Sequence, residues 1–259
     1  MSLEKANSSS SQLYLVSMGI GDPDNITLRA LKTVEKADVV FANINLQEKF
    51  SHLLQNKELH EAGHGLFTSL ARRKSTDAEV DTMEANTRRV IDEAISVGKT
   101  VAVLDYGDPM VFGPQAGYIN EFSELNPIVV PGVSSFNAAN AAVARGLTDG
   151  PNSESVILTA AKTARENYEG TDTLAKLAET QSTMAFFTMG IDLQEVVKQL
   201  KQQYPADTPM AIVFNAGTLE KQSVLHATLD TIIEKTEGQE LPFEHMIYIG
   251  DFLKENGYK

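Results

Sequence analysis

Short apolar runs alternate with longer amphipathic stretches along the first half of the chain. Two stretches, 27–37 and 78–97, carry apolar residues at helical spacing, with Thr27 as an N-cap and Gly98 just after the second. The apolar runs have the length and the β-branched content of strands. They lie at 12–18, 39–42, 100–104 and 128–130. Strands separated by helices predict a parallel sheet with right-handed crossovers.

The second half alternates in the same way but contains a hairpin signal. Strands are expected at 156–160, 184–188, 210–215, 223–227 and 246–250, and helices at 173–179, 193–203 and 229–235. The two strands joined by the Gly217 loop predict an antiparallel pair, and therefore a mixed sheet. Turn-forming residues at 146–152 place a domain boundary near Gly150. We expect an α/β protein with domains at 12–150 and 151–259, after a polar, Ser-rich, disordered tail at 1–11.

Three strands of the first half run into corners rich in glycine and proline. These are G-I-G-D-P at 19–23, Y-G-D-P at 106–109 and P-G-V-S-S at 131–135, named below the first, central and third corners. Glycine lets the backbone approach a ligand closely, and proline fixes the turn. Open α/β sheets bind ligands at the carboxyl ends of their strands. The first corner lacks the third glycine of a dinucleotide fingerprint, so that interpretation is weak.

Charge and composition exclude several classes of partner. The net charge of −13 and the pI of 4.8 argue against a nucleic-acid surface. No apolar run approaches the ~18 residues of a membrane span, so we expect no membrane partner. With no cysteine there is no disulfide, thiolate metal site or cysteine nucleophile, which fits a cytoplasmic protein.

The segment 43–76 is the least patterned part of the chain, and we expect a mobile loop or lid there. His60 and His64 have the spacing of a helical zinc motif, but Gly63 between them weakens a helix. We therefore expect no metal site.

The three corners, in this order, resemble the tetrapyrrole methylase family. The resemblance rests on V-S-M-G-I-G-D-P-D at 16–24, Y-G-D-P-M-V-F-G at 106–113 and V-P-G-V-S-S at 130–135, and it continues at 28–40, 183–190 and 209–218. It implies two α/β domains of a class III methyltransferase with the cofactor cleft between them, in a homodimer. It also implies that S-adenosylmethionine is the cofactor and that the substrate is a tetrapyrrole of a cobalamin or sirohaem pathway.

The resemblance also implies a set of cofactor-binding residues. These are Ile20, Tyr106, Gly107, Asp108, Val111, Ser134, Ser135, Met189 and Ala216. Backbone groups at glycine corners suit the carboxylate, amine and ribose of the cofactor, and Val111 and Met189 suit its adenine. Core packing is the alternative for Met189.

The departures from the family pattern concern the substrate. Ser17 and Ile20 replace a glycine and a proline, and Asn43 stands where uroporphyrinogen methylases have an aspartate that is a proposed proton acceptor. We therefore assign no catalytic residue. Candidate cations for substrate carboxylates are Arg72, Arg73, Arg145 and Lys162. Two alternatives stay open: a methyltransferase of the same fold acting on a peptide or protein, and a non-catalytic protein that binds cofactor or tetrapyrrole.

Overall fold

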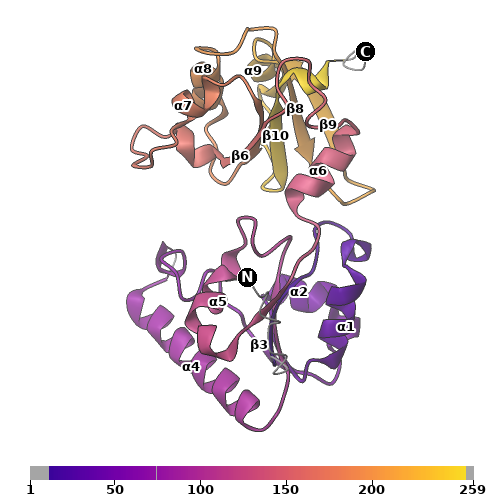
Figure 1. Ribbon diagram of the computed structural model, residues 1–259, viewed down its shortest axis with the longest axis vertical. Helices are drawn as coiled ribbons and strands as arrows, with labels where there is room; N and C mark the ends of the chain where they lie inside the picture. The colour runs from indigo at the N-terminus through magenta and orange to yellow at the C-terminus, as the bar shows by residue number, and fades with distance from the viewer. Residues whose placement is uncertain (1–11, 74, 255–259) are drawn as a thin grey trace, which may run out of the picture. The chain divides into compact units, whose positions relative to one another are not determined.

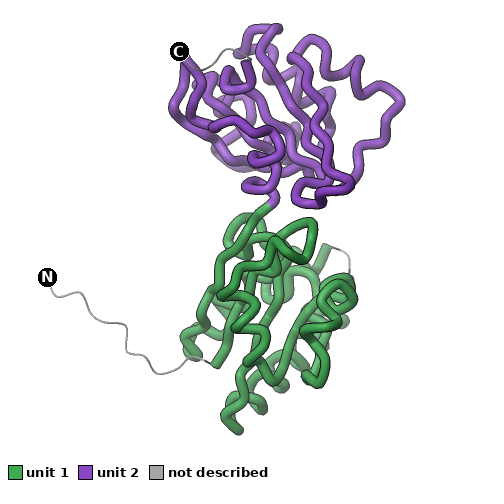
Figure 2. Tube along the Cα trace, turned by 90° about the vertical axis from the view of Figure 1, so that its right-hand side faces the viewer, with its two compact units in different colours: residues 1–134 green, residues 135–259 purple. Residues whose placement is uncertain are grey.

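The computed structural model describes residues 12–73 and 75–254, in two compact units (Figure 2). The first unit comprises residues 1–134 and the second 135–259, and each is described by itself. The tail expected at 1–11 lies outside the described residues. Within the described ranges, none of the helices combines the length and the apolar character needed to cross a bilayer.

The first unit is built on a parallel sheet, as the sequence predicts, but the sheet has five strands and not the four expected. Its strands are β1 (Leu13–Ser17), β2 (Val39–Phe41), β3 (Glu58–His60), β4 (Val101–Asp105) and β5 (Ile128–Val130), in the order β3-β2-β4-β1-β5. All five residues of β4 are buried. Ser17 pairs with Asp105, and Val16 with Val130, so β1, β4 and β5 end close together.

Helices cover both faces of this sheet (Figure 1). α1 (Leu28–Lys36), α2 (Ile44–Lys49) and α3 (Ser51–Leu54) pack on one face, and α4 (Asp77–Ser96) and α5 (Gly117–Glu121) on the other. The alternation of strand side chains explains the two cores: Val16 and Leu104 face α1, whereas Leu15 and Val103 face α4. Short 3-10 turns complete the unit: η1 (Pro23–Asn25), η2 (Ala71–Arg73), η3 (Pro114–Ala116) and η4 (Ser123–Leu125).

The second unit has the mixed sheet that the hairpin signal predicts. Its strands are β6 (Val156–Ala160), β7 (Thr183–Phe187), β8 (Pro209–Phe214), β9 (Ser223–Thr228) and β10 (His245–Ile249), in the order β6-β7-β10-β8-β9. β6 and β7 are parallel, and the other neighbours, including the β8–β9 hairpin, are antiparallel. Its helical elements are α6 (Ser135–Val143), η5 (Ala161–Ala164), α7 (Leu174–Ala178), α8 (Leu193–Leu200), α9 (Ile232–Thr236) and η6 (Asp251–Leu253).

The division between the units falls after Ser134, earlier than the boundary predicted near Gly150. Helix α6 packs against β8, β9 and β10, and the Tyr248 hydroxyl donates to the Phe136 carbonyl at 2.9 Å. The turn-forming cluster at 146–152 therefore connects α6 to β6 inside the second unit.

The expectation of an irregular loop at 43–76 is wrong for its first part. This segment forms α2, α3 and the edge strand β3, whose His60 pairs with Phe41 of β2. β3 (Glu-Leu-His) carries only one apolar residue, and α2 and α3 have six and four residues, so the hydrophobic pattern of the chain could not reveal them.

Candidate functional site

Candidate site at the carboxyl ends of β1, β4 and β5

The first and central corners leave the sheet at a topological switch point. β1 and β4 are neighbours, but α1, which follows β1, and α5, which follows β4, pack on opposite faces. In open α/β sheets a crevice forms at this point, where the chain leaves adjacent strands in opposite directions. The third corner follows β5, on the other side of β1. The fold thus brings all three corners to one edge.

A single buried hydroxyl, that of Ser17, joins the three corners. Its Oγ donates to the Gly107 carbonyl at 2.6 Å and accepts from the Gly19 amide at 3.2 Å. A Cβ atom on Gly132 would lie 2.1 Å from this Oγ, so the third corner must have glycine there. Sequence reasoning noted Ser17 only as a departure from the family, and the contacts explain what the residue does.

The Gly107 backbone is hydrogen-bonded on one side and unobstructed on the other. Its amide donates to the Gly19 carbonyl at 2.8 Å, and its φ of +76° is a conformation that favours glycine. Among the described residues, a Cβ atom placed on Gly107 would meet only the Ser134 Cα, at 3.8 Å. A ligand can therefore approach this backbone closely.

The Asp108 carboxylate ties the central corner to the third. Its Oδ1 accepts from the Met110 amide at 2.8 Å and its Oδ2 from the Gly132 amide at 3.1 Å. Beyond it, Met110 and Phe112 are 51% and 46% exposed. The corner thus presents apolar side chains beside open backbone, although the sequence pointed only to Val111, which is half-buried.

Asp105, the last residue of β4, was not among the predicted site residues. Its buried carboxylate accepts from the amides of Tyr106, at 2.8 Å, and Gln115, at 3.0 Å. Burial raises the pKa of this carboxyl from 3.8 to about 6; the two amides oppose the rise, and the nearby Asp108 charge adds to it. The sequence signal that could have identified Asp105 is an acidic residue directly after an apolar run, here residues 100–104.

Hydrogen bonds at Tyr106 and at the Ile20 carbonyl fix the backbone of the first corner. The Tyr106 hydroxyl accepts from the Gly21 amide at 3.3 Å, and the Lys49 ammonium donates to the Gly21 carbonyl and lies 5.2 Å from the centre of the Tyr106 ring. Ile20 is buried, and its carbonyl accepts from Asn25 Nδ2 at 2.7 Å. Lys49 was missed by the sequence analysis because only the fold brings α2 to this corner.

Asn43 acts as the N-cap of α2. Its Oδ1 accepts from the Leu46 amide at 2.9 Å, which satisfies a donor at the start of the helix. The side chain at the family's acid position is therefore engaged in local structure.

Met189 and Ala216, the predicted residues that follow strands of the second unit, come after two strands that run in the same direction. β7 and β8 are both antiparallel to β10, and Phe187 and Val213 are both level with Met246. Met189 and Ala216 therefore leave the sheet at the same edge. Met189 is 49% exposed, so its alternative interpretation as a core residue is wrong, whereas Ala216 is buried.

Two further predicted residues sit on either side of the division between the units. Ser134 is buried in the first unit, and Ser135 begins α6 of the second. In the second unit a pocket of about 600 Å³ opens beside Gly190, lined by residues of η5 and α8.

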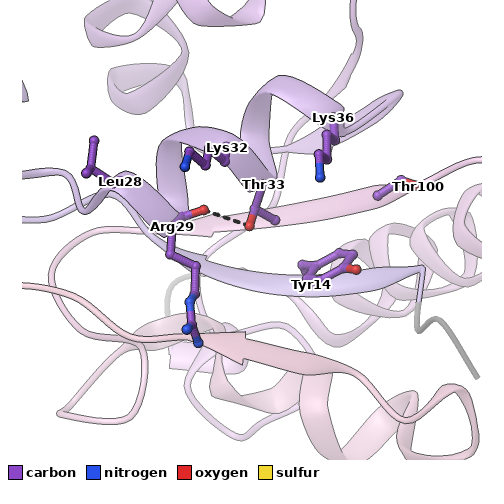
Figure 3. Close-up of a pocket in the computed structure, with 7 residues that line it drawn as sticks. All are labelled: Tyr14, Leu28, Arg29, Lys32, Thr33, Lys36 and Thr100. Atoms are coloured by element: carbon purple, nitrogen blue, oxygen red, sulfur yellow. Dashed lines mark hydrogen bonds between the residues drawn. The ribbon is translucent and has the colours of Figure 1, made fainter. Parts of the chain in front are cut away.

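A second pocket, of about 400 Å³, lies along α1 (Figure 3). Arg29, Lys32 and Lys36 line it, together with Tyr14 at the start of β1 and Thr100 just before β4. These last two residues mark the amino ends of the strands, so the pocket is separate from the corners.

Arg72, one of the four predicted cations, and His60 of the histidine pair have partners of other kinds. Arg72 forms ion pairs with Asp77 at 3.1 Å and Asp81 at 2.8 Å. His60 ends β3, contacts Glu58 at 3.0 Å and stacks on a phenylalanine, so no zinc-binding helix forms. Within the part of the chain that is described, no three His, Asp or Glu side chains gather as they would around a metal ion.

Comparison with known families identifies the chain. The family model of tetrapyrrole (corrin/porphyrin) methylases matches residues 12–233. The chain belongs to this family. It is 30% identical over 254 residues to the cobalt-precorrin-4 C(11)-methyltransferase of Methanocaldococcus jannaschii, a match that covers 95% of this chain and 90% of the relative. The resemblance read from the three corners is thereby confirmed.

Solved structures agree with the family assignment. A cobalt precorrin-4 methyltransferase of cobalamin biosynthesis has a TM-score of 0.71 and 26% identity, covering 93% of this chain and 95% of its own. A uroporphyrin-III C-methyltransferase from Thermus thermophilus, complexed with S-adenyl homocysteine, has a TM-score of 0.65 and 23% identity, with coverage of 93% and 98%. The expected fold class, two α/β domains of this family, is confirmed.

Proposed function

We propose that this protein is a methyltransferase that uses S-adenosylmethionine to methylate a tetrapyrrole of the cobalamin or sirohaem pathways. The observation that carries the proposal is the match to a cobalt-precorrin-4 methyltransferase over nearly the whole of both chains. A precorrin-like corrinoid intermediate is therefore the first substrate to test. Uroporphyrinogen III comes second, because Asn43 replaces the aspartate expected for that substrate.

The residues at the corners fit such a cofactor. Open backbone beside Gly107 suits the polar amino-acid and ribose groups, and the exposed side chains of Met110 and Phe112 suit an apolar ring. When bound, the cofactor supplies an electrophilic methyl group. The chain's own contribution is position: Ser17 and Asp108 lock the three corners together, so that a ligand meets a preorganised surface.

The chemistry demands alignment more than a strong base. The forming carbon–carbon bond takes an electron pair from the tetrapyrrole, and the breaking carbon–sulfur bond returns a pair to sulfur. A carbon that is already nucleophilic needs no carboxylate at position 43 to begin this transfer. The cofactor role of the predicted residues in both units, Tyr106, Ser134, Ser135 and Ala216 among them, stays a prediction.

Calorimetric titration with S-adenosylhomocysteine tests the proposal. We expect micromolar binding by the unaltered protein, weakened at least about tenfold by Asp108→Ala, which unties the central corner, and by Met189→Ala, which removes exposed apolar contact. Absence of binding by the unaltered protein would refute the methyltransferase assignment. Binding should be followed by turnover assays with precorrin-type substrates and with uroporphyrinogen III.

Two expectations about the assembled protein accompany this proposal. We infer a homodimer, as the family resemblance implies, and a cytoplasmic location, which fits the absence of cysteine. Light scattering at several protein concentrations tests the first, and fractionation of the source cells tests the second.

A further inference from the structure

Lys49 places a positive charge at the edge where the corners meet. It is the last residue of α2, and its side chain reaches back from that helix to the first corner. The ammonium donates to the Gly21 carbonyl, and its Nζ lies 5.2 Å from the centre of the Tyr106 ring, at a distance typical of a cation–π contact. Lys49 therefore contacts both the first and the central corner.

This charge is not neutralised within the described residues. None of their carboxylates lies within 4.0 Å of the Lys49 ammonium, whereas Lys99 pairs with Glu58 and Lys201 with Asp230, each at 2.7 or 2.8 Å. An ammonium has three hydrogen-bond donors, and the Gly21 carbonyl takes one of them. At least one donor remains for a group that arrives with a ligand.

The chemistry of that group follows from the charge and the place. A cation beside a switch point, in a chain of net charge −13, is suited to an anion that the protein itself does not supply. Both molecules of the proposed reaction carry carboxylates: the tetrapyrrole on its side chains and the cofactor on its amino-acid end. Resting on the proposed function, we propose that Lys49 binds a carboxylate of the ligand held at these corners.

The competing explanation is that Lys49 only stabilises the Gly21 backbone through its hydrogen bond, and the chain offers a matched control for this role. Lys57 also donates to backbone carbonyls, those of Glu35 at 3.0 Å and Ala37 at 2.7 Å. It directly precedes β3, so it lies at the amino ends of the strands, whereas the corners lie at the carboxyl ends. Lys57→Met therefore removes hydrogen bonds from a lysine to backbone carbonyls without changing the corners.

The experiment compares the full-length Lys49→Met, Lys49→Arg and Lys57→Met proteins with the unaltered chain. S-adenosylhomocysteine is titrated by calorimetry, and uroporphyrin III, which is rich in carboxylates, by fluorescence quenching, at low and at high salt. Thermal unfolding checks that each variant is folded. We expect Lys49→Met to weaken one ligand about tenfold, less at high salt, with most of the affinity kept by Lys49→Arg and all of it by Lys57→Met.

The ligand that loses affinity identifies the carboxylate. A loss confined to uroporphyrin III assigns Lys49 to the substrate, and a loss confined to S-adenosylhomocysteine assigns it to the cofactor. Equal affinities for the unaltered and Lys49→Met proteins overturn the proposal and leave the methyltransferase assignment intact. If the unaltered protein binds neither ligand, the proposed function itself fails, and the role of Lys49 fails with it.

Discussion

The buried carboxyl group of Asp105 is expected to make the protein less stable, relative to a neutral variant, as pH rises. Its pKa in the folded chain is about 6, compared with 3.8 for the free side chain, chiefly because burial disfavours the charged form. Between these two values the folded state holds a proton that the unfolded state has lost. The free energy of unfolding therefore falls as pH increases through this window, by about 3 kcal/mol in total.

Asp105→Asn isolates this contribution. The amide cannot ionise, and its oxygen can still accept from the amide of Tyr106 or of Gln115, though not from both. We expect the unaltered protein to lose about 3 kcal/mol of stability relative to the variant between about pH 3 and pH 7, and almost nothing further above that range. Urea unfolding at a series of pH values, followed by circular dichroism, measures the difference.

The exposed Asp207 provides a control for the chemical change itself. Asp207→Asn makes the same replacement on the surface of the second unit, where burial imposes no cost. A difference between the unaltered and Asp105→Asn proteins that stays flat, or that grows in favour of the unaltered protein as pH rises, would refute the reasoning. Such a result would mean that the two amide donors outweigh the burial of the charge.

Three further changes test the local contacts. Gly132→Ala should lower the free energy of unfolding by about 2 kcal/mol, because the added Cβ clashes with the Ser17 side chain. The double variant Ser17→Gly/Gly132→Ala should lose at least about 1 kcal/mol less than the sum of the two single losses, because the clash is gone. Strictly additive losses in urea unfolding would contradict this. Asn43→Ala should cost about 1 kcal/mol and Asn43→Asp almost nothing, since both natural caps accept the same amide; equal losses would exclude a capping role. Thr76→Ala should likewise lose about 1 kcal/mol, because Thr76 and Glu79 form a capping box on α4, and Thr76→Ser should restore it in thermal unfolding.

The hydrophobic pattern was enough to predict all five strands of the second sheet and four of the five strands of the first. Each strand that carries a β-branched or aliphatic run was found within one residue of its observed limits, as at 128–130 and 156–160. The hairpin at Gly217 predicted the mixed second sheet. The features that were predicted wrongly are either short or determined by tertiary packing. β3 has three residues with no apolar period. α6 belongs to the second unit because it packs there, and no local turn signal reports such packing.

The candidate site was predictable only in outline. Glycine corners after strands indicated where a ligand would bind, because their chemistry is local. The contacts that unite the corners join residues far apart in the chain: Ser17 and Gly107 are 90 positions apart, and Lys49 reaches a corner that precedes it by 28. Only the strand order β4-β1-β5 brings such groups together, so a sequence without its topology cannot assign them partners.

Asn43 separates the demands of folding from those of chemistry. Asp and Asn are equally good N-caps, and either would accept the Leu46 amide at the start of α2. The stability of the helix therefore gives no reason to prefer the neutral side chain over a charged one. The two differ in their ability to take up a proton at the carboxyl end of β2, beside β4 and the central corner. The choice of asparagine thus bears on the substrate: it suits a carbon that is nucleophilic before any proton leaves, and this requirement distinguishes the tetrapyrroles that should be tried first.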